Sequence, residues 1–166
     1  MDVIQNLLQS EEPLVSLQAH LRLLDEDERS QPIVAMREAA WASPLARSLL
    51  SEQAATGEIP HHPYRKWQGA HWVRACLANL GYPTGDQSLQ PLFDQEYAWL
   101  LSEGHLRSVK TIRGRVRRCA SQEGNALSAA ITLGMIDERA HLLAERLVKW
   151  QWADGGWNCD KKPELV

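Results

Sequence analysis

The chain has 166 residues, a net charge of −3 and a pI near 6.1, with 44% hydrophobic and 23% charged residues. This length suits one globular domain with its own core, and the acidic balance argues against a nucleic-acid-binding protein. No apolar run is long enough to span a bilayer, we expect no signal peptide, and the cysteines at positions 76, 119 and 159 are too far apart for a disulfide framework. These features predict a cytoplasmic protein with reduced thiols.

Residues 1–55 predict a small region of short helices. Apolar side chains recur at three- and four-residue spacing in residues 2–10 and again in residues 14–24. Two more helices are expected to begin at Ser30-Gln31-Pro32 and Ser43-Pro44, where proline fits the first helical turn. Residues 56–65 then contain a glycine and two prolines, which oppose regular structure. We interpret them as a linker and a soft boundary.

Residues 66–166 predict helical hairpins. Residues 66–80 are apolar or aromatic almost all round, which is typical of a buried helix. A second helix is expected from an Asp86 cap to Leu101, with Gly104-His105 at its end. Residues 124–133 and the helix from Glu138 predict another pair, whereas the basic stretch within 106–123 is not assigned. No alternation of four or more residues indicates a strand, so the predicted fold class is all-α.

An internal repeat relates the two predicted hairpins. Residues 69–81 and 124–134 are both helices of small residues that end in Leu-Gly. Each is followed by a turn that holds an acid and by a Leu-rich helix that carries a tryptophan, Trp99 or Trp150. Repeats of this kind bury their faces only by stacking on neighbours. We expect the N-terminal helices to cover one open face and a partner outside this chain to cover the other.

The segment Gln151-Trp152-Ala153-Asp154-Gly155-Gly156-Trp157 resembles the QW repeat of the squalene/hopene cyclase and protein prenyltransferase superfamily. Residues 66–72, 80–83 and 117–125 are further similar to bacterial cyclase-like proteins. The resemblance covers about residues 64–163. It implies an α/α toroid around an apolar cavity, in which the Gln side chain caps a helix end and the Trp ring stacks beside it. The chain has room for about half of such a toroid, so we expect either that it is a fragment of a longer protein or that the toroid is completed by a second copy, as in a homodimer, or by another chain.

The resemblance also implies an enzyme, or part of one, that acts on an isoprenoid or another apolar substrate. His71 and Glu123 would be its catalytic residues. The basic run from 110 to 118 would grip a diphosphate at the cavity rim, because Arg forks match phosphate oxygens. The substrate-binding residues would be Trp67, Trp72, Arg117, Arg118 and Cys119.

Other interpretations of these residues stay open. The D-x-D-D acid of class II terpenoid cyclases is absent, and the similar string Asp25-Glu26-Asp27-Glu28 is expected at a solvated helix end. His71 is also explained as a hydrogen-bonded core histidine, the tryptophans as packing, and the basic run as a loop paired with acids such as Glu123. The alternative function is a non-catalytic helical-repeat module that binds a protein partner or an apolar ligand.

Zinc is the one metal that the sequence suggests. Cys159 and Asp160, together with Cys119 and His71, supply donor types that zinc prefers. However, no C-x-x-C or H-x-x-x-H spacing is present, so no cofactor is favoured. The alternative is that Cys76 and Cys119 are buried as small hydrophobes and that Cys159 is a loop thiol. The adjacent His61 and His62 are expected on the linker surface.

Overall fold

The computed structural model describes residues 2–160, and its regular structure is helical apart from one two-stranded hairpin, which confirms the all-α fold class. The N-terminal helices are α1 (Val3–Leu8), α2 (Pro13–Leu23), α3 (Gln31–Ala40) and α4 (Pro44–Leu49). The remaining elements are α5 (Ala70–Leu80), a single 3-10 turn η1 (Gln87–Leu89), α6 (Gln90–Leu100), α7 (Glu103–Ser108), β1 (Lys110–Ile112), β2 (Arg115–Arg117), α8 (Ser121–Thr132) and α9 (Glu138–Trp150).

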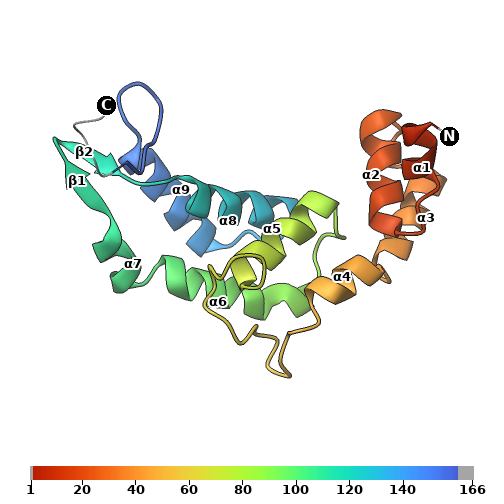
Figure 1. The fold of residues 1–166 in the computed structure, drawn as a ribbon, viewed down its shortest axis with the longest axis horizontal. Helices are drawn as coiled ribbons and strands as arrows, with labels where there is room; N and C mark the ends of the chain where they lie inside the picture. The colour runs from red at the N-terminus through yellow and green to blue at the C-terminus, as the bar shows by residue number, and fades with distance from the viewer. Residues whose placement is uncertain (1, 161–166) are drawn as a thin grey trace.

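The molecule is elongated, and the chain runs from one end to the other before α8 and α9 return to the middle (Figure 1). Helices α1–α3 form one end, the β1–β2 hairpin and the turn after α9 form the other, and α5, α6, α8 and α9 lie between them. Helix α5 packs against both α6 and α8, and α8 packs against α9. The core is continuous, since it joins Leu14 and Ile33 of the N-terminal helices to Leu77, Phe93 and Leu133 in the middle of the molecule.

The two Leu-Gly turns have the same geometry. Gly81 and Gly134 close α5 and α8 with φ angles of 75° and 66°, a left-handed conformation that favours glycine. The next residue bonds back to the helix in each case, Tyr82 N–H to Leu77 O at 3.0 Å and Met135 N–H to Ala130 O at 2.8 Å. The chain therefore contains two helical hairpins with one turn design. Closure into a toroid remains a prediction.

Two specific contacts tie α2 to other elements, one to α4 within the N-terminal region and one to the turn of the first hairpin. The Glu12 carboxylate accepts hydrogen bonds from Leu14 N–H at the start of α2 and from Ser43 Oγ and Leu45 N–H at the start of α4. Gln18 of α2 packs so closely on Gly81 that a Cβ at Gly81 would lie 1.9 Å from Gln18 Nε2. Both contacts tie α2 to elements far away in the sequence.

The linker of residues 56–65 has no helix or strand, but it is packed. Ile59 is buried in the core, and its backbone N–H and C=O bond to the Gln95 side chain of α6 at 3.2 and 2.6 Å. His61 pairs with Glu52 at 2.7 Å. The segment thus lies against α6 along this stretch.

Three local expectations differ from the structure. Helix α5 begins at Ala70 instead of residue 66, because Trp67 has a φ of 67° that a right-handed helix does not allow. Gly104 and His105 do not end a helix but lie inside α7, which Ser102 caps by accepting from His105 N–H. The unassigned stretch contains an antiparallel hairpin around Arg113-Gly114, two residues with positive φ, as tight hairpin turns require. Between residues 2 and 160, no helix combines the length and apolarity needed to cross a membrane.

Candidate functional site

A buried ion network connects α5 to α6. Glu96 on α6 accepts from His71 Nδ1 at 2.6 Å and from Arg74 Nη1, and all three side chains are almost fully buried. Arg74 also lies over the Phe93 ring, with Cζ 3.3 Å from the ring centroid. Because Glu96 is shared by two bases, its charge is compensated inside the core, as buried charges require.

His71 is neutral in this setting. Burial, and then the positive charge of Arg74, lower its pKa from 6.5 to about 4. With Nδ1–H donated to Glu96, the lone pair on Nε2 has no hydrogen-bond partner among the described residues, and neither has Trp72 Nε1–H beside it. His71 therefore behaves as a core histidine at neutral pH.

A chain of aromatic rings leads from this network to a second one. Tyr64 stacks on Trp99 with ring centroids 5.4 Å apart and contacts His71 at 4.9 Å. Trp99 then meets His62 at 5.4 Å and His105 at 4.7 Å, both edge to face. Trp99 thus stands between the buried His71 and the second network around His105.

The second network joins α7 to the start of α8. The Glu123 carboxylate contacts His105 Nε2 at 3.2 Å and receives Arg118 Nε and Nη2, the latter at 2.6 Å. Arg118 Nη2 also reaches Gln122 Oε1 and His105 Nε2. Burial alone would raise the pKa of Glu123, but the hydrogen bonds from His105 and Arg118 and the charge of Arg118 hold it below its usual range.

This second network opens onto a cavity of about 450 Å³. His62 and Trp99 form an aromatic wall, and His105 and Arg118 offer polar atoms at the other side. The remaining lining residues are Ser102, Gly104, Ser108 and Gln122. A volume of this size is typical of small-molecule sites, and a titratable cluster beside such a cavity marks a candidate functional site. We refer to it as the His105 cavity.

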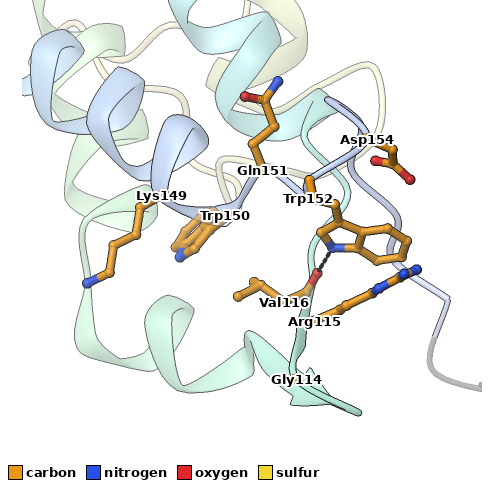
Figure 2. A pocket seen from close by; sticks show the side chains of 9 residues that line it. Gly114, Arg115, Val116, Lys149, Trp150, Gln151, Trp152 and Asp154 are labelled. Atoms are coloured by element: carbon orange, nitrogen blue, oxygen red, sulfur yellow. Dashed lines mark hydrogen bonds between the residues drawn. The ribbon is translucent and has the colours of Figure 1, made fainter.

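A second cavity, of about 580 Å³, lies beside the turn that follows α9 (Figure 2). It is lined by Gly114, Arg115 and Val116 of the hairpin and by residues 149–154. Trp152 Nε1–H donates to Val116 O at 2.8 Å, and Arg115 extends alongside the Trp152 ring, 4.9 Å from its centroid. The Trp152 ring is therefore already engaged by the hairpin.

The QW-like turn, residues 151–157, is held to α9 by a side-chain hydrogen bond. Its Gln and Trp residues have roles different from those that the resemblance implies. The Gln151 side chain bonds to Gly155 O at 2.7 Å, inside the turn, and does not cap a helix end. Instead the Trp157 indole N–H donates to Leu147 O at 2.9 Å, in the last turn of α9. A parallel bridge between Arg117 and Asn158 then attaches the segment to β2.

The predicted site residues are brought together only in part. Arg118 and Glu123 are hydrogen-bonded, and Arg118 lines the His105 cavity, while Glu123 lies behind it. His71 and Trp72 do not line either of the two cavities described above. The prediction that Trp67 lies on a buried inner helix is wrong. Trp67 lies in the turn before α5, where its side chain is 61% exposed and its ring contacts Trp72.

Arg117 and Cys119 also differ from expectation. Arg117 is buried at 5% exposure and stacks on Trp152, 4.8 Å from the ring centroid, with Nε and Nη1 unpaired among residues 2–160. It does not line the His105 cavity. Cys119 is exposed and not buried as a small hydrophobe, because it follows β2 on the surface, beside the exposed Cys159.

The donor set for zinc does not converge. His71 is bonded to Glu96 in the core, whereas Cys119 and Cys159 are at the surface. No group of three or more His, Cys, Asp or Glu side chains within the described range is arranged to hold a metal ion. The residues present therefore do not fit a zinc site, and we derive no step that uses one.

Four site residues were not predicted: Arg74, Glu96, Trp99 and His105. The sequence did carry a sign of the first two, since each is a charged residue on the apolar face of a helix, between Val73 and Leu77 or between Phe93 and Tyr97. Charged residues at core positions are almost always paired, so two on adjacent helices indicate a buried ion pair. His105 gave no comparable sign, because its role depends on the fold of α7.

Comparison with family models, with curated proteins and with solved structures finds no match to this chain.

Proposed function

We propose that the His105 cavity binds the anionic head group of an organic substrate, in a protein that works as part of a cyclase/prenyltransferase-like enzyme. An isoprenoid diphosphate is the substrate class that the resemblance implies. The observation that supports the proposal is the network of Glu123, Arg118 and His105 at the wall of the cavity. It places a fixed cation and a histidine beside a space large enough for a small ligand.

Arg118 retains donor capacity for such a ligand. Within residues 2–160, its hydrogen bonds to Glu123, Gln122 and His105 use Nε and Nη2, which leaves the N–H groups of Nη1 for a ligand oxygen. Glu123 holds the guanidinium in place from behind. A guanidinium fixed in this way matches phosphate or carboxylate oxygens at little cost in side-chain entropy.

His105 has two alternative hydrogen-bonding arrangements in this network. Arg118 can only donate, so its contact with Nε2 needs the proton of a neutral His105 on Nδ1, whereas the contact with Glu123 needs a proton on Nε2. A ligand anion that attracts Arg118 would favour the second arrangement. Glu123 itself stays ionised, because its pKa is lowered, so it positions His105 and does not act as an acid.

The aromatic wall would contact the part of the substrate next to the charged group. Trp99 and His62 present ring faces and edges there, which suit allylic or other unsaturated carbon. The cavity volume accommodates the head group and a short apolar segment. A longer isoprenoid tail would need apolar surface contributed from outside the described residues.

The test is the binding of inorganic pyrophosphate and of farnesyl diphosphate, measured by calorimetry on the full chain. We expect both to bind, with the farnesyl compound tighter, and Arg118→Lys to weaken both by about tenfold, because the charge stays while the fork is lost. Arg107→Lys is the matched control, since Arg107 is an exposed arginine of α7 that pairs with Glu103. Absence of pyrophosphate binding to the unaltered chain, or equal losses in both variants, would contradict the proposal.

A second candidate function is a non-catalytic helical-repeat module that binds a second copy of the chain. It is favoured by exposed apolar side chains on α8, α9 and the turn between them: Ile131, Ile136, Leu142 and Val148. In a helical-repeat protein, a terminal repeat buries its open face by stacking on a neighbouring repeat. Native mass spectrometry and calorimetry together distinguish the candidates. The module predicts a dimer that Val148→Glu dissociates and no binding of pyrophosphate, whereas the ligand site predicts pyrophosphate binding whether or not the chain is a dimer.

A further inference from the structure

Two cysteines that are far apart in the sequence lie side by side at one end of the molecule. The parallel bridge between Arg117 and Asn158 aligns the residues that follow β2 with those that follow the QW-like turn. Cys159 comes directly after Asn158 and Cys119 two residues after Arg117; both are exposed, and their thiols interact with each other. Segments bridged in this way lie about 4.8 Å apart and rise about 3.3 Å per residue, so an offset of one residue gives a Cα separation of about 6 Å, which a disulfide spans.

The two thiols have unequal reactivity. Hydrogen bonding from Ser121, whose Oγ lies 3.4 Å from Cys119 Sγ, together with Cys159 and the charge of Arg118, lowers the pKa of Cys119 despite some burial. The pKa of Cys159 is raised, chiefly by its hydrogen bond to Cys119. Cys119 is therefore the better nucleophile, because the thiolate is the attacking form.

We propose that Cys119 and Cys159 are a redox-active dithiol that closes to a reversible intramolecular disulfide and fastens the segment after α9 to the start of α8. The sequence did not indicate this pair, since its members are separated by a whole helical hairpin. The inference does not depend on the function of the His105 cavity.

The oxidant is a small disulfide such as oxidised glutathione. The Cys119 thiolate attacks one sulfur of the oxidant, which forms a mixed disulfide and releases one thiolate. Cys159 then loses its proton to water and attacks the Cys119 sulfur, which forms the protein disulfide and releases the second thiolate. Both leaving groups take up protons, so the dithiol is oxidised by two electrons and the oxidant is reduced to two thiols.

Cys76 provides the internal control. It is half-buried in α5, and burial raises the pKa of its thiol. It should therefore stay reduced under conditions that oxidise the exposed pair. A Cys76→Ser chain should behave like the unaltered chain in every assay of the pair.

The experiment treats the reduced full chain with oxidised glutathione, blocks the remaining thiols with iodoacetamide and maps the products by mass spectrometry. We expect the monomer to lose two hydrogens, to retain one alkylated cysteine at position 76, and to yield a cross-linked peptide that contains Cys119 and Cys159. Cys159→Ser should stop at the mixed disulfide on Cys119, and Cys119→Ser should react much more slowly. Dithiothreitol should reverse the reaction.

Thermal unfolding gives a second measurement. Closing a loop of this length should raise Tm by roughly 5–10 °C in the oxidised chain, and by nothing in either single serine variant. Disulfide-linked dimers in place of the internal link, or equal glutathione labelling of all three cysteines, would overturn the proposal.

Discussion

Glu96 occupies a position on α6 where the helical pattern would otherwise place an apolar side chain. It lies between Phe93 and Tyr97 and is fully buried, yet its two oxygens are both used, one by His71 and one by Arg74. Such a network adds little net stability over an apolar core of the same volume, but it penalises the loss of any one member. Its effect is to fix α5 and α6 in a single register.

Replacing this one carboxylate should therefore be costly. We expect Glu96→Gln to lower the free energy of unfolding by about 3–5 kcal/mol, because Arg74 is left buried without a counter-charge. Urea denaturation followed by circular dichroism measures the change. Glu103→Gln, which removes the exposed pair with Arg107, should cost less than about 1 kcal/mol. If the two variants lose similar stability, Glu96 is not held as an ion.

At the scale of elements, the two hairpins depend on their Leu-Gly turns. Both glycines have left-handed backbone angles, but their surroundings differ. A Cβ at Gly81 would collide with Gln18 of α2, whereas a Cβ at Gly134 would touch Thr84 at an ordinary 3.4 Å. The first turn thus also carries the contact with the N-terminal helices.

Alanine substitutions should separate these two effects. Gly134→Ala should cost about 1 kcal/mol through backbone strain alone, and Gly81→Ala should cost more, because Gln18 must also move. Gly124 is the control, since it lies within α8 with open space around it, and Gly124→Ala should stabilise the chain by roughly 0.5–1 kcal/mol. Thermal unfolding of the three variants gives the order of their stabilities. A lower Tm for Gly134→Ala than for Gly81→Ala would contradict the prediction.

Periodicity in the sequence was sufficient to predict the helices and the repeated turn, because both depend on local spacing and on glycine at helix ends. It failed from residue 103 to 117, where a six-residue helix and two three-residue strands are too short for a period to be visible. It also placed Trp67 in a helix, since nothing local reveals a left-handed tryptophan.

The candidate site was predictable only where residues adjacent in sequence are also adjacent in space. Arg118 and Glu123 are only five residues apart, on either side of the start of α8, so their pairing could be anticipated. Trp99 on α6 and His105 on α7 meet at this site by tertiary packing, which cannot be predicted from a single sequence. The donors considered for zinc do not converge for the same reason, because His71 is buried in the core beside Glu96 whereas Cys119 and Cys159 are exposed.

At the scale of the whole molecule, the free energy of unfolding depends on pH, because folding changes the pKa values of buried groups such as His71 and Glu123. The pKa of His71 is about 4 in the folded chain and about 6.5 when the chain unfolds, because the core excludes its charged form. Below pH 6.5, His71 of the unfolded chain therefore binds a proton that His71 of the folded chain does not bind. Stability is then lost as pH falls from about 6.5 toward 4.

The expected loss from His71 approaches about 3 kcal/mol at the acid end of this window. Urea midpoints measured between about pH 7 and pH 5 isolate it, because the carboxylates with lowered pKa values, such as Glu12 and Glu123, titrate below their usual 4.5. His71→Gln should flatten the profile in that interval. His141→Gln, at an exposed position of α9, should leave it unchanged. If the stability of His71→Gln still falls steeply between about pH 7 and pH 5, His71 is not the cause of the pH dependence.

The bridge between Arg117 and Asn158 also constrains the order in which the chain can fold. Helices α8 and α9 lie between its two partners in the sequence, so the bridge and the Trp152 bond to Val116 close only after both helices are in place. During synthesis the β1–β2 hairpin must wait for about forty further residues before it gains this support, and contacts with such long separations form slowly. Until then Arg117 has no Trp152 ring to cover it, so we expect the hairpin of the nascent chain to be open to proteolysis.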